Sequence, residues 1–283
     1  MTATSDVATA PVSPGAAARP ARSQRRLAYG WRVLRTGVAF LTFGIGAIVV
    51  AAVVWPLRLL PRRTDARREV QAQRVVHGAF RLFAWWMATL GLVRVSWIGA
   101  ERLRGRGPRL IVANHPTLID VVLLLTRLPQ ADCIVKTAAR RNPFMRRIVT
   151  GAGYLANDDG DALVDACADR IGRGRSVVLF PEGTRSPRGG LRRFQRGAAH
   201  IALKSGCPIV PVVITCRPPT LLKGQPWHDV PDRRARFVLR VEEPIDPARY
   251  LGAETTLPVA ARRLTADLHL LYERRLDADE GTT

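Results

Sequence analysis

The sequence is poor in cysteine. It has 4 Cys in 283 residues, namely Cys133, Cys167, Cys207 and Cys216, and they form no Cys-x-x-Cys pair. This spacing excludes a disulfide framework and a cysteine zinc site, and it indicates small core residues in a reducing compartment. The sequence also lacks an internal repeat. It has no secretory signal pattern, because no apolar core closely follows the initiator methionine.

Acidic residues are scarce as well. Asp and Glu number 23 against 44 Lys and Arg, which gives a formal net charge of +21. An excess of this size indicates an anionic partner: a nucleic acid, an anionic membrane surface or a phosphorylated substrate. No nucleic-acid-binding motif occurs, so we expect no nucleic acid. Hydrophobic residues make up 47% of the chain, which is enough for a substantial core.

The N-terminal third predicts a membrane anchor. Residues 1–28 lack periodicity and predict a disordered basic tail. Gly37–Trp55 is uncharged and long enough to span a bilayer, and arginines flank both of its ends. Val75–Ile98 is apolar and rich in Trp and Phe, which is typical of an interfacial helix. We expect residues 29–91 to form a membrane-associated hairpin on the cytoplasmic face of the cell membrane. The alternatives are a true span and a buried core hairpin.

From about residue 92 short apolar runs alternate with helical patterns. This texture predicts an α/β fold with a mixed sheet flanked by helices, over a main domain at 92–250. The expected strands are Val93–Ile98, Leu110–Ala113, Cys133–Lys136, Val177–Phe180, Ile209–Ile214 and Phe237–Val241. The expected helices are Leu118–Arg127, Arg141–Thr150, Ala162–Gly172 and Arg196–Ser205. Residues 251–283 predict an amphipathic closing helix and a tail, with Pro258–Leu276 as the helix.

One stretch suggests catalytic chemistry. His115 follows the expected strand Leu110–Ala113, and Asp120 lies five residues further on. Positions five apart do not share a face of one helix, so the two side chains can meet only if His115 lies outside the helix. That arrangement suits a general base whose second ring nitrogen is held by a carboxylate. The alternative is a histidine that caps a helix.

A second candidate stretch is Phe180–Ser186, which reads Phe-Pro-Glu-Gly-Thr-Arg-Ser after the expected strand Val177–Phe180. Such a run forms a tight loop at the carboxyl end of a strand, the edge where open α/β sheets bind ligands. Arg185 offers a planar fork of donors suited to phosphate. The alternative is a solvated basic loop.

Together these motifs resemble those of the glycerolipid acyltransferases typified by 1-acylglycerol-3-phosphate acyltransferase. The resemblance covers roughly residues 90–220. Its four motifs are Asn114-His115 with Asp120, Gly151–Asp159, Phe180–Ser186, and Pro208–Pro211, and Lys136 and Phe194–Ala198 fit the spacing between them. The third motif is complete.

The resemblance implies a catalytic domain at 92–250 that moves an acyl group from a thioester to a lipid hydroxyl. The donor is acyl-CoA or acyl-acyl carrier protein as co-substrate, with no other cofactor and no metal. The acceptor it implies first is 1-acyl-sn-glycerol-3-phosphate, which would give phosphatidic acid. His115 takes the proton of the hydroxyl, and Asp120 fixes its tautomer. The residues implied in substrate binding are Asn114, Lys136, Glu182, Gly183, Thr184 and Arg185.

One departure concerns the acceptor. The second motif of the family ends in an acidic residue followed by arginine, whereas here Asp158 is followed by Asp159. Compensation by Arg140, Arg141, Arg146 or Arg147 is one reading, and another lysolipid or a hydroxyacyl lipid as acceptor is the other. Two further classes compete. They are a hydrolase that uses the same site, and a non-enzymatic protein that binds nucleic acid or anionic lipid.

Overall fold

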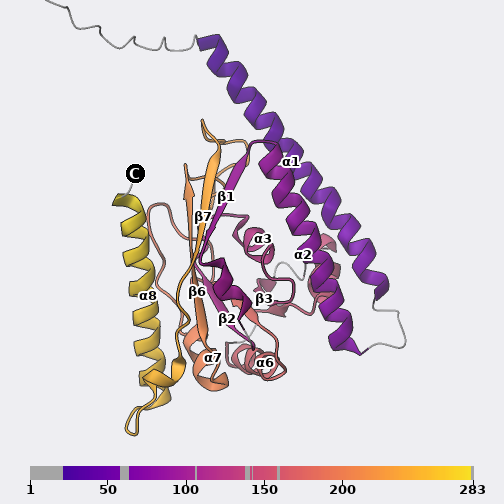
Figure 1. Cartoon of the computed structure of the whole chain (residues 1–283). Helices are drawn as coiled ribbons and strands as arrows, with labels where there is room; N and C mark the ends of the chain where they lie inside the picture. The colour runs from indigo at the N-terminus through magenta and orange to yellow at the C-terminus, as the bar shows by residue number, and fades with distance from the viewer. Residues whose placement is uncertain are drawn as a thin grey trace, which may run out of the picture.

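The computed structural model describes residues 22–57, 64–105, 107–137, 141, 143–157 and 160–281. Residues 1–21 of the predicted disordered tail lie outside these residues, whereas 22–28 are helical and form the start of α1 (Arg22–Leu57), so the predicted tail is too long. A seven-stranded sheet divides the chain into two layers of helices, with α1, α2 and α3 on one side and α7 and α8 on the other (Figure 1). The predicted fold class, a mixed α/β sheet flanked by helices, is confirmed.

The sheet has the strand order β1-β7-β6-β2-β5-β3-β4, and every pairing is parallel except that of β6 with β7. The strands are β1 Val93–Ile98, β2 Leu110–Ala113, β3 Asp132–Val135, β4 Leu155–Ala156, β5 Val177–Leu179, β6 Ile209–Arg217 and β7 Ala235–Val241. Six of these match expected strands. The two-residue β4 was not expected, because so short a run carries no periodic signal.

The central strands are buried on both faces, which explains their continuous apolar sequences. Leu110 and Val112 of β2 face α7 and α8, whereas Ile111 and Ala113 face α2 and α3. The helices of the domain are α3 Asp120–Leu125, α5 Pro143–Gly151, α6 Gly160–Gly172, α7 Gly197–Ser205 and α8 Leu257–Gly281, with 3-10 turns η1 Ala100–Arg104 and η2 Pro247–Tyr250.

The N-terminal hairpin consists of α1 Arg22–Leu57 and α2 Asp65–Thr89, which lie side by side in Figure 1. The prediction of one interfacial helix over Val75–Ile98 is wrong in its last third. Gly91 adopts a φ of 70° after α2, and Val93–Ile98 then pairs with β7 as strand β1. The alternating apolar and polar residues of that segment favour a strand over a longer helix.

A partly buried ionic cluster fixes the hairpin to the domain. Glu69 of α2 pairs with Arg170 and Arg175, and Arg175 also pairs with Asp132 at the start of β3. Burial alone raises the pKa of Glu69, but the hydrogen bonds from the two arginines hold that pKa below its ordinary value. Gln73 of α2 adds hydrogen bonds to Asp132 and to a backbone carbonyl, each 2.9 Å long. These contacts set one orientation of α2 against the sheet.

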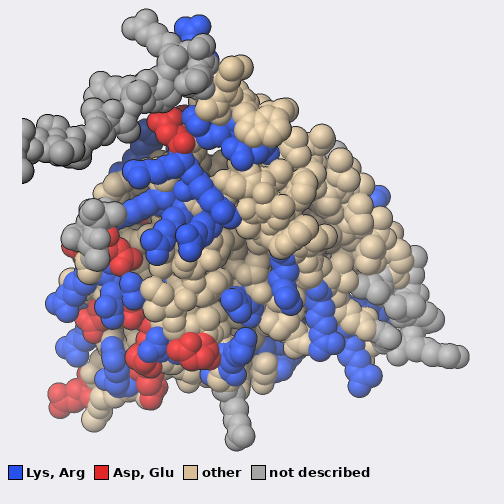
Figure 2. Space-filling view, turned by 45° about the horizontal axis from the view of Figure 1, so that its top comes forward, with Lys and Arg blue, Asp and Glu red and all other residues tan. Residues whose placement is uncertain are grey.

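The outer face of the hairpin is apolar and open. Residues 26–56 of α1 form a helix long and apolar enough to cross a membrane, and 17% of its most apolar window is buried. The exposed large side chains on α1 include Trp31, Leu34, Leu41, Ile45, Ile48, Val49 and Trp55. This exposure argues against the buried core hairpin. Figure 2 shows a broad area without charged side chains beside a dense group of Lys and Arg.

Candidate active site

His115 lies in the loop between β2 and α3. Its ring stacks on Phe180, with centroids 4.3 Å apart, and its Nδ1 lies 2.8 Å from Asp120 Oδ2. Because an ionised carboxylate only accepts hydrogen bonds, Nδ1–H donates and the lone pair of the neutral ring is on Nε2. The His115 side chain is 20% exposed, so a substrate can reach the ring. The predicted contact between His115 and Asp120 is present, with His115 outside the helix.

Asp120 is the first residue of α3, and its carboxylate is fully buried. It also accepts hydrogen bonds from the backbone N–H and the hydroxyl of Thr117, each 2.6 Å long. Burial raises the pKa of Asp120, although the bonds from His115 and Thr117 act in the opposite direction. Among the described residues Asp120 is bonded to His115 and Thr117 and to no arginine or lysine. The pair is therefore suited to stabilise an imidazolium on His115.

Helix α3 is shorter than the expected Leu118–Arg127. Before it, the N–H of Leu118 donates to the carbonyl of Leu221, 3.1 Å away, instead of entering the helix. The amide of Thr117 is bonded to Asp120. Backbone amides at the start of this helix were one possible source of oxyanion stabilisation. Those of Thr117 and Leu118 are occupied by protein acceptors, so this role requires other groups.

The side chain of Glu182 holds the loop that carries His115. Its carboxylate is buried and accepts from the backbone N–H of His115 at 2.9 Å, the hydroxyl of Ser186 at 2.7 Å and the N–H of Arg192 at 3.0 Å. The carbonyl of His115 accepts from the N–H of Ser186 at 2.7 Å. Glu182 thus joins the third motif to the histidine loop. These bonds use both of its carboxylate oxygens.

The rest of the third motif turns toward solvent and a neighbouring loop. Gly183 has a φ of 65°, and a Cβ there would lie 2.9 Å from Gln195. Thr184 Oγ1 accepts from Lys136 Nζ at 3.2 Å, and this lysine is exposed. Arg185 donates through Nη1 to the carbonyls of Leu221 and Leu222. Its other guanidinium nitrogens make no bond to the described part of the protein.

Asn114 does not face the site. Its side chain is buried, donates to the carbonyl of Ile214 at 2.9 Å and accepts from the N–H of the same residue at 2.7 Å. This two-way bond replaces a ladder pair between β2 and β6. Asn114 therefore fixes the strand end that carries His115.

The second motif is described in part. Asp158, Asp159 and Arg140 lie outside the described residues. A Cβ on Gly151 would lie 2.3 Å from Val54 of α1, and one on Gly153 would lie 2.3 Å from Glu69 of α2. Because these two glycines have no side chain, α1 and α2 of the hairpin can pack closely against the second motif. Of the arginines considered as compensation, Arg147 stacks on Trp55 near the end of α1, so its guanidinium is committed to the hairpin.

Two contacts of His115 and Asp120 were missed from the sequence. The first is Thr117, which together with Asp120 has the Thr-x-x-Asp spacing of a capping box. That spacing is the signal that would have found it. The second is Phe180, which stacks on His115. No local signal marks this contact, since 65 positions of chain separate the two residues.

The chain is similar to known acyltransferases. Residues 94–215 match the family model described as Acyltransferase. A 1-acyl-sn-glycerol-3-phosphate acyltransferase of Helicobacter pylori is 35% identical over 116 residues, which cover 38% of this chain and 48% of the relative. A lyso-ornithine lipid O-acyltransferase of Pseudomonas aeruginosa is 30% identical over 162 residues, covering 56% and 59%. The chain spans about half the length of the curated relatives it matches.

The fold has a solved counterpart. The crystal structure of the 1-acyl-sn-glycerophosphate acyltransferase of Thermotoga maritima superposes with a TM-score of 0.68 at 21% identity, covering 87% of this chain and 96% of that one. At this identity the likeness concerns the fold. It extends beyond the residues of the family model, because it covers most of the chain.

Proposed function

Because residues 94–215 of the chain belong to the glycerolipid acyltransferase family, we propose that the protein is a membrane-bound acyltransferase. It transfers a fatty acyl group from a thioester, acyl-CoA or acyl-acyl carrier protein, to the hydroxyl of a lysolipid. The observation that carries the proposal is the 2.8 Å contact between Nδ1 of His115 and the buried carboxylate of Asp120. This contact leaves Nε2 of an accessible ring free to take a proton.

The reaction proceeds by direct attack in this proposal. The lipid hydroxyl gives its proton to Nε2 of His115 while its oxygen bonds to the thioester carbonyl carbon. Asp120 stabilises the resulting imidazolium, which then gives the proton to the leaving thiolate. An ester forms, the thioester C–S bond breaks, and a free thiol leaves. Exposed Lys136, beside Thr184, is the cation we assign to the negative charge that develops on the carbonyl oxygen.

An acyl-enzyme on cysteine is disfavoured by the state of the thiols. The reactive form of cysteine is the thiolate. Burial raises the pKa of the Cys167 and Cys216 thiols to about 12, and that of Cys207 to about 11. Burial also raises the pKa of Cys133. All four therefore remain protonated near neutral pH.

The acceptor we propose first is 1-acyl-sn-glycerol-3-phosphate. The Helicobacter pylori relative is named for it, and Nε and Nη2 of Arg185 have no hydrogen bond to the described residues. A second candidate is a lysolipid without a phosphate monoester. The Pseudomonas aeruginosa relative is named for lyso-ornithine lipid, and Asp159 replaces the arginine expected in the second motif.

The protein works at a membrane surface in this proposal. The exposed apolar face of α1 enters the cytoplasmic leaflet, as the predicted hairpin would. The support is the exposure of that face together with the net charge of +21, which favours an anionic surface. A lysolipid then reaches His115 without leaving the membrane.

The test is acyl transfer by His115→Ala in full-length protein in lipid nanodiscs. A panel of lysophosphatidate, lyso-ornithine lipid and lysophosphatidylcholine is offered with labelled acyl-CoA or acyl-acyl carrier protein. Loss of a general base should lower turnover by about 10²–10⁴-fold. His200→Ala on α7 removes an imidazole from a helix on the other side of the sheet, and turnover should be retained.

Two results would contradict the proposal. One is a His115→Ala protein that keeps more than about a tenth of wild-type turnover, because a general base contributes at least about 10²-fold. The other is thioester hydrolysis that no acceptor in the panel changes. The second result would identify the hydrolase instead.

A further inference from the structure

The C-terminal helix α8 places one polar side chain inside the sheet, between β2 and β6. Tyr272 is fully buried there. Its hydroxyl donates to the carbonyl of Val112 at 2.5 Å and accepts from the backbone N–H of Val212 at 3.0 Å. Burial raises the pKa of this hydroxyl, so it stays protonated and keeps its donor. A side chain from outside the residues that match the family model, 94–215, therefore joins the two strands.

The hydroxyl lies where a backbone hydrogen bond is expected. β2 and β6 are parallel, and Val112 lies opposite Pro211. The N–H of Leu110 donates to the carbonyl of Pro208 at 3.2 Å, which shows that the even-numbered residues of β2 are the ones that bond to β6. In a parallel ladder of this phase, the N–H of Val212 would donate directly to the carbonyl of Val112. The hydroxyl bridges these two groups and so sets the distance between the strands at this point.

The bridged position is close to the proposed general base. His115 follows Val112 by three residues in the chain. The next bond along the ladder is also made by a side chain, because Asn114 exchanges two hydrogen bonds with Ile214. Asn114 belongs to the strand end itself, whereas Tyr272 comes from a separate helix. The position of the strand end that carries His115 therefore depends in part on α8.

The ring of Tyr272 contacts a second support of the same loop. It meets Phe194 with ring centroids 5.1 Å apart. Two residues before Phe194, the N–H of Arg192 donates to the buried carboxylate of Glu182 at 3.0 Å. That carboxylate also accepts from the N–H of His115 at 2.9 Å. Tyr272 thus bonds to the strand that precedes His115 and packs on the segment that holds Glu182.

We propose that Tyr272 is a positioning residue for the transfer reaction. Its hydroxyl fixes the spacing of β2 from β6, and this spacing sets where Nε2 of His115 lies relative to the substrates. The inference rests on the proposed function and adds α8 to the parts of the chain on which turnover depends. Without the hydroxyl, the two backbone groups either lose their partner or bond to each other, and both outcomes move the strand end. A displacement of about 1 Å at a reacting group can lower the rate by on the order of 10²-fold.

The test is the steady-state kinetics of Tyr272→Phe, as full-length protein in lipid nanodiscs, with the acceptor of the panel that wild type uses best. The kcat should fall by about 10–100-fold, while the KM values for acceptor and thioester stay within about twofold, since no group that touches a substrate is removed. Both proteins are assayed well below their melting temperatures.

The matched control is Tyr250→Phe. Tyr250 is buried in the same apolar cluster as Tyr272, on the same side of the sheet. In the described structure its hydroxyl accepts from Arg249 at 2.7 Å and donates to Asp267 at 2.9 Å, and it bonds to neither strand. The kcat of this variant should stay within about twofold of wild type, because the spacing of β2 from β6 does not depend on it.

A second measurement separates positioning from a general loss of structure. In a His115→Ala background, Tyr272→Phe should change the residual turnover by no more than about twofold, because a residue that acts through His115 has no imidazole left to position. A purely structural role would lower the residual turnover by the same factor as in wild type, and that result overturns the inference. Unchanged kcat in Tyr272→Phe overturns it too. If His115→Ala itself keeps wild-type turnover, the proposed function fails first, and the inference fails with it.

Phe194→Leu keeps the test decisive if Tyr272→Phe does not fold. This variant retains both hydrogen bonds of the hydroxyl and removes the ring that packs on Tyr272. Its kcat should fall by a smaller factor, about 3–10-fold, and the fall should again disappear in the His115→Ala background. Unchanged kcat in Phe194→Leu, or an equal fall in the two backgrounds, overturns the inference.

Discussion

The loop between β2 and α3, called the histidine loop because it carries His115, differs from the N-terminal hairpin in how its side chains are bonded. In the loop, both oxygens of Asp120 and both of Glu182 accept hydrogen bonds, and both carboxylates are buried. In the hairpin, α1 exposes large apolar side chains along its whole length. Where α1 meets the domain, the Nε atoms of Arg32 and Arg35 are buried without a hydrogen-bond partner among the described residues.

This difference reflects what each region has to contact. A general base acts only when its ring is held in one orientation, so the groups around His115 bond to one another. A membrane-facing helix needs an apolar surface and no fixed partner, because lipid supplies its contacts. The cluster of Glu69, Arg170 and Arg175 connects the two regions by holding α2 on the domain.

The largest expected effect comes from breaking the order of the histidine loop with Asp120→Asn. The amide can present N–H groups to Nδ1 of His115, which favours the wrong tautomer and removes the lone pair from Nε2. We expect turnover to fall by about 10²–10⁴-fold with the fold retained, because the substitution is isosteric. Steady-state kinetics and a thermal unfolding curve measure the two quantities. Wild-type turnover in this variant would show that Asp120 serves only to start α3.

The hairpin should respond in membrane affinity. Leu41, Ile45 and Ile48 are 64%, 53% and 54% exposed on one face of α1. Burial of each in lipid is worth about 1.5–3 kcal/mol, so replacing all three by Glu should weaken vesicle binding by on the order of 10³-fold or more. Flotation with liposomes measures it. High salt should leave the wild-type protein bound, because apolar insertion is not screened.

The control for this experiment is Arg262→Glu/Arg274→Glu on the exposed face of α8, which changes net charge without touching α1. It should float with the liposomes as wild type does. If salt alone releases the wild-type protein, or if the control loses binding as the α1 variant does, the attachment is electrostatic.

The connection between the regions can be broken at one glycine. Gly153 has a φ of 67°, and a Cβ there would lie 2.3 Å from the carboxylate of Glu69. Gly153→Ala should therefore displace Glu69 from Arg170 and Arg175 and lower the free energy of unfolding by about 1–3 kcal/mol. Gly78→Ala in α2 is the matched control, since a Cβ there meets nothing within 4 Å. It should raise stability by about 0.5–1 kcal/mol. Equal melting temperatures for the two variants would be inconsistent with this account.

The sequence predicted the α/β domain well, for physical reasons that particular residues show. Strands such as Leu110–Ala113 are buried on both faces and are therefore apolar throughout, which makes them easy to recognise. His115 and Asp120 are five residues apart, so their contact depends on local chain geometry. Contacts that join distant segments were not predictable. Glu182 appeared suited to a substrate site, but it binds the backbone of His115, 67 positions away.

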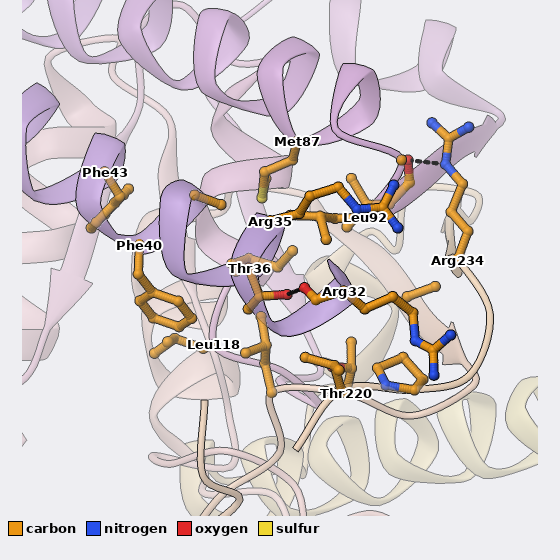
Figure 3. A pocket seen from close by; sticks show the side chains of 18 of the residues that line it. Arg32, Arg35, Thr36, Phe40, Phe43, Met87, Leu92, Leu118, Thr220 and Arg234 are labelled. Atoms are coloured by element: carbon orange, nitrogen blue, oxygen red, sulfur yellow. Dashed lines mark hydrogen bonds between the residues drawn. The ribbon is translucent and has the colours of Figure 1, made fainter. Parts of the chain in front are cut away.

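The packing of the hairpin could not be predicted from the sequence. Hydropathy found α1, but no pattern in one sequence tells which face of an apolar helix meets protein and which meets lipid. The pocket between α1 and the β6–β7 loop (Figure 3) depends on which face of α1 packs against protein. Arg32 and Arg35 lie five and two residues before Gly37, the start of the uncharged apolar run, and in the sequence they look like flanking charges. Only the packing of α1 on the β6–β7 loop places them with Arg233 and Arg234.

The smallest expected effect concerns a row of like charges in the sheet of the α/β domain. Arg94, Arg236 and Arg217 are direct register neighbours on β1, β7 and β6, so three guanidinium groups share one row of the sheet. Like charges directly opposite one another are destabilising by about 0.2–1 kcal/mol. Arg236→Thr should therefore raise the free energy of unfolding by an amount in that range, since threonine also favours strands.

The salt dependence of that gain separates repulsion from strand preference. Chemical denaturation at low salt should show the full gain, and about 0.5 M salt should remove the part due to charge, because screening is strong at that ionic strength. Arg240→Thr on the same strand is the matched control. Arg240 pairs with Asp279 at 3.1 Å, so its loss should lower stability instead. If Arg236→Thr lowers stability as Arg240→Thr does, an anionic group already neutralises the row. The charges in this row of the sheet would then be paired, as the carboxylates of the histidine loop are.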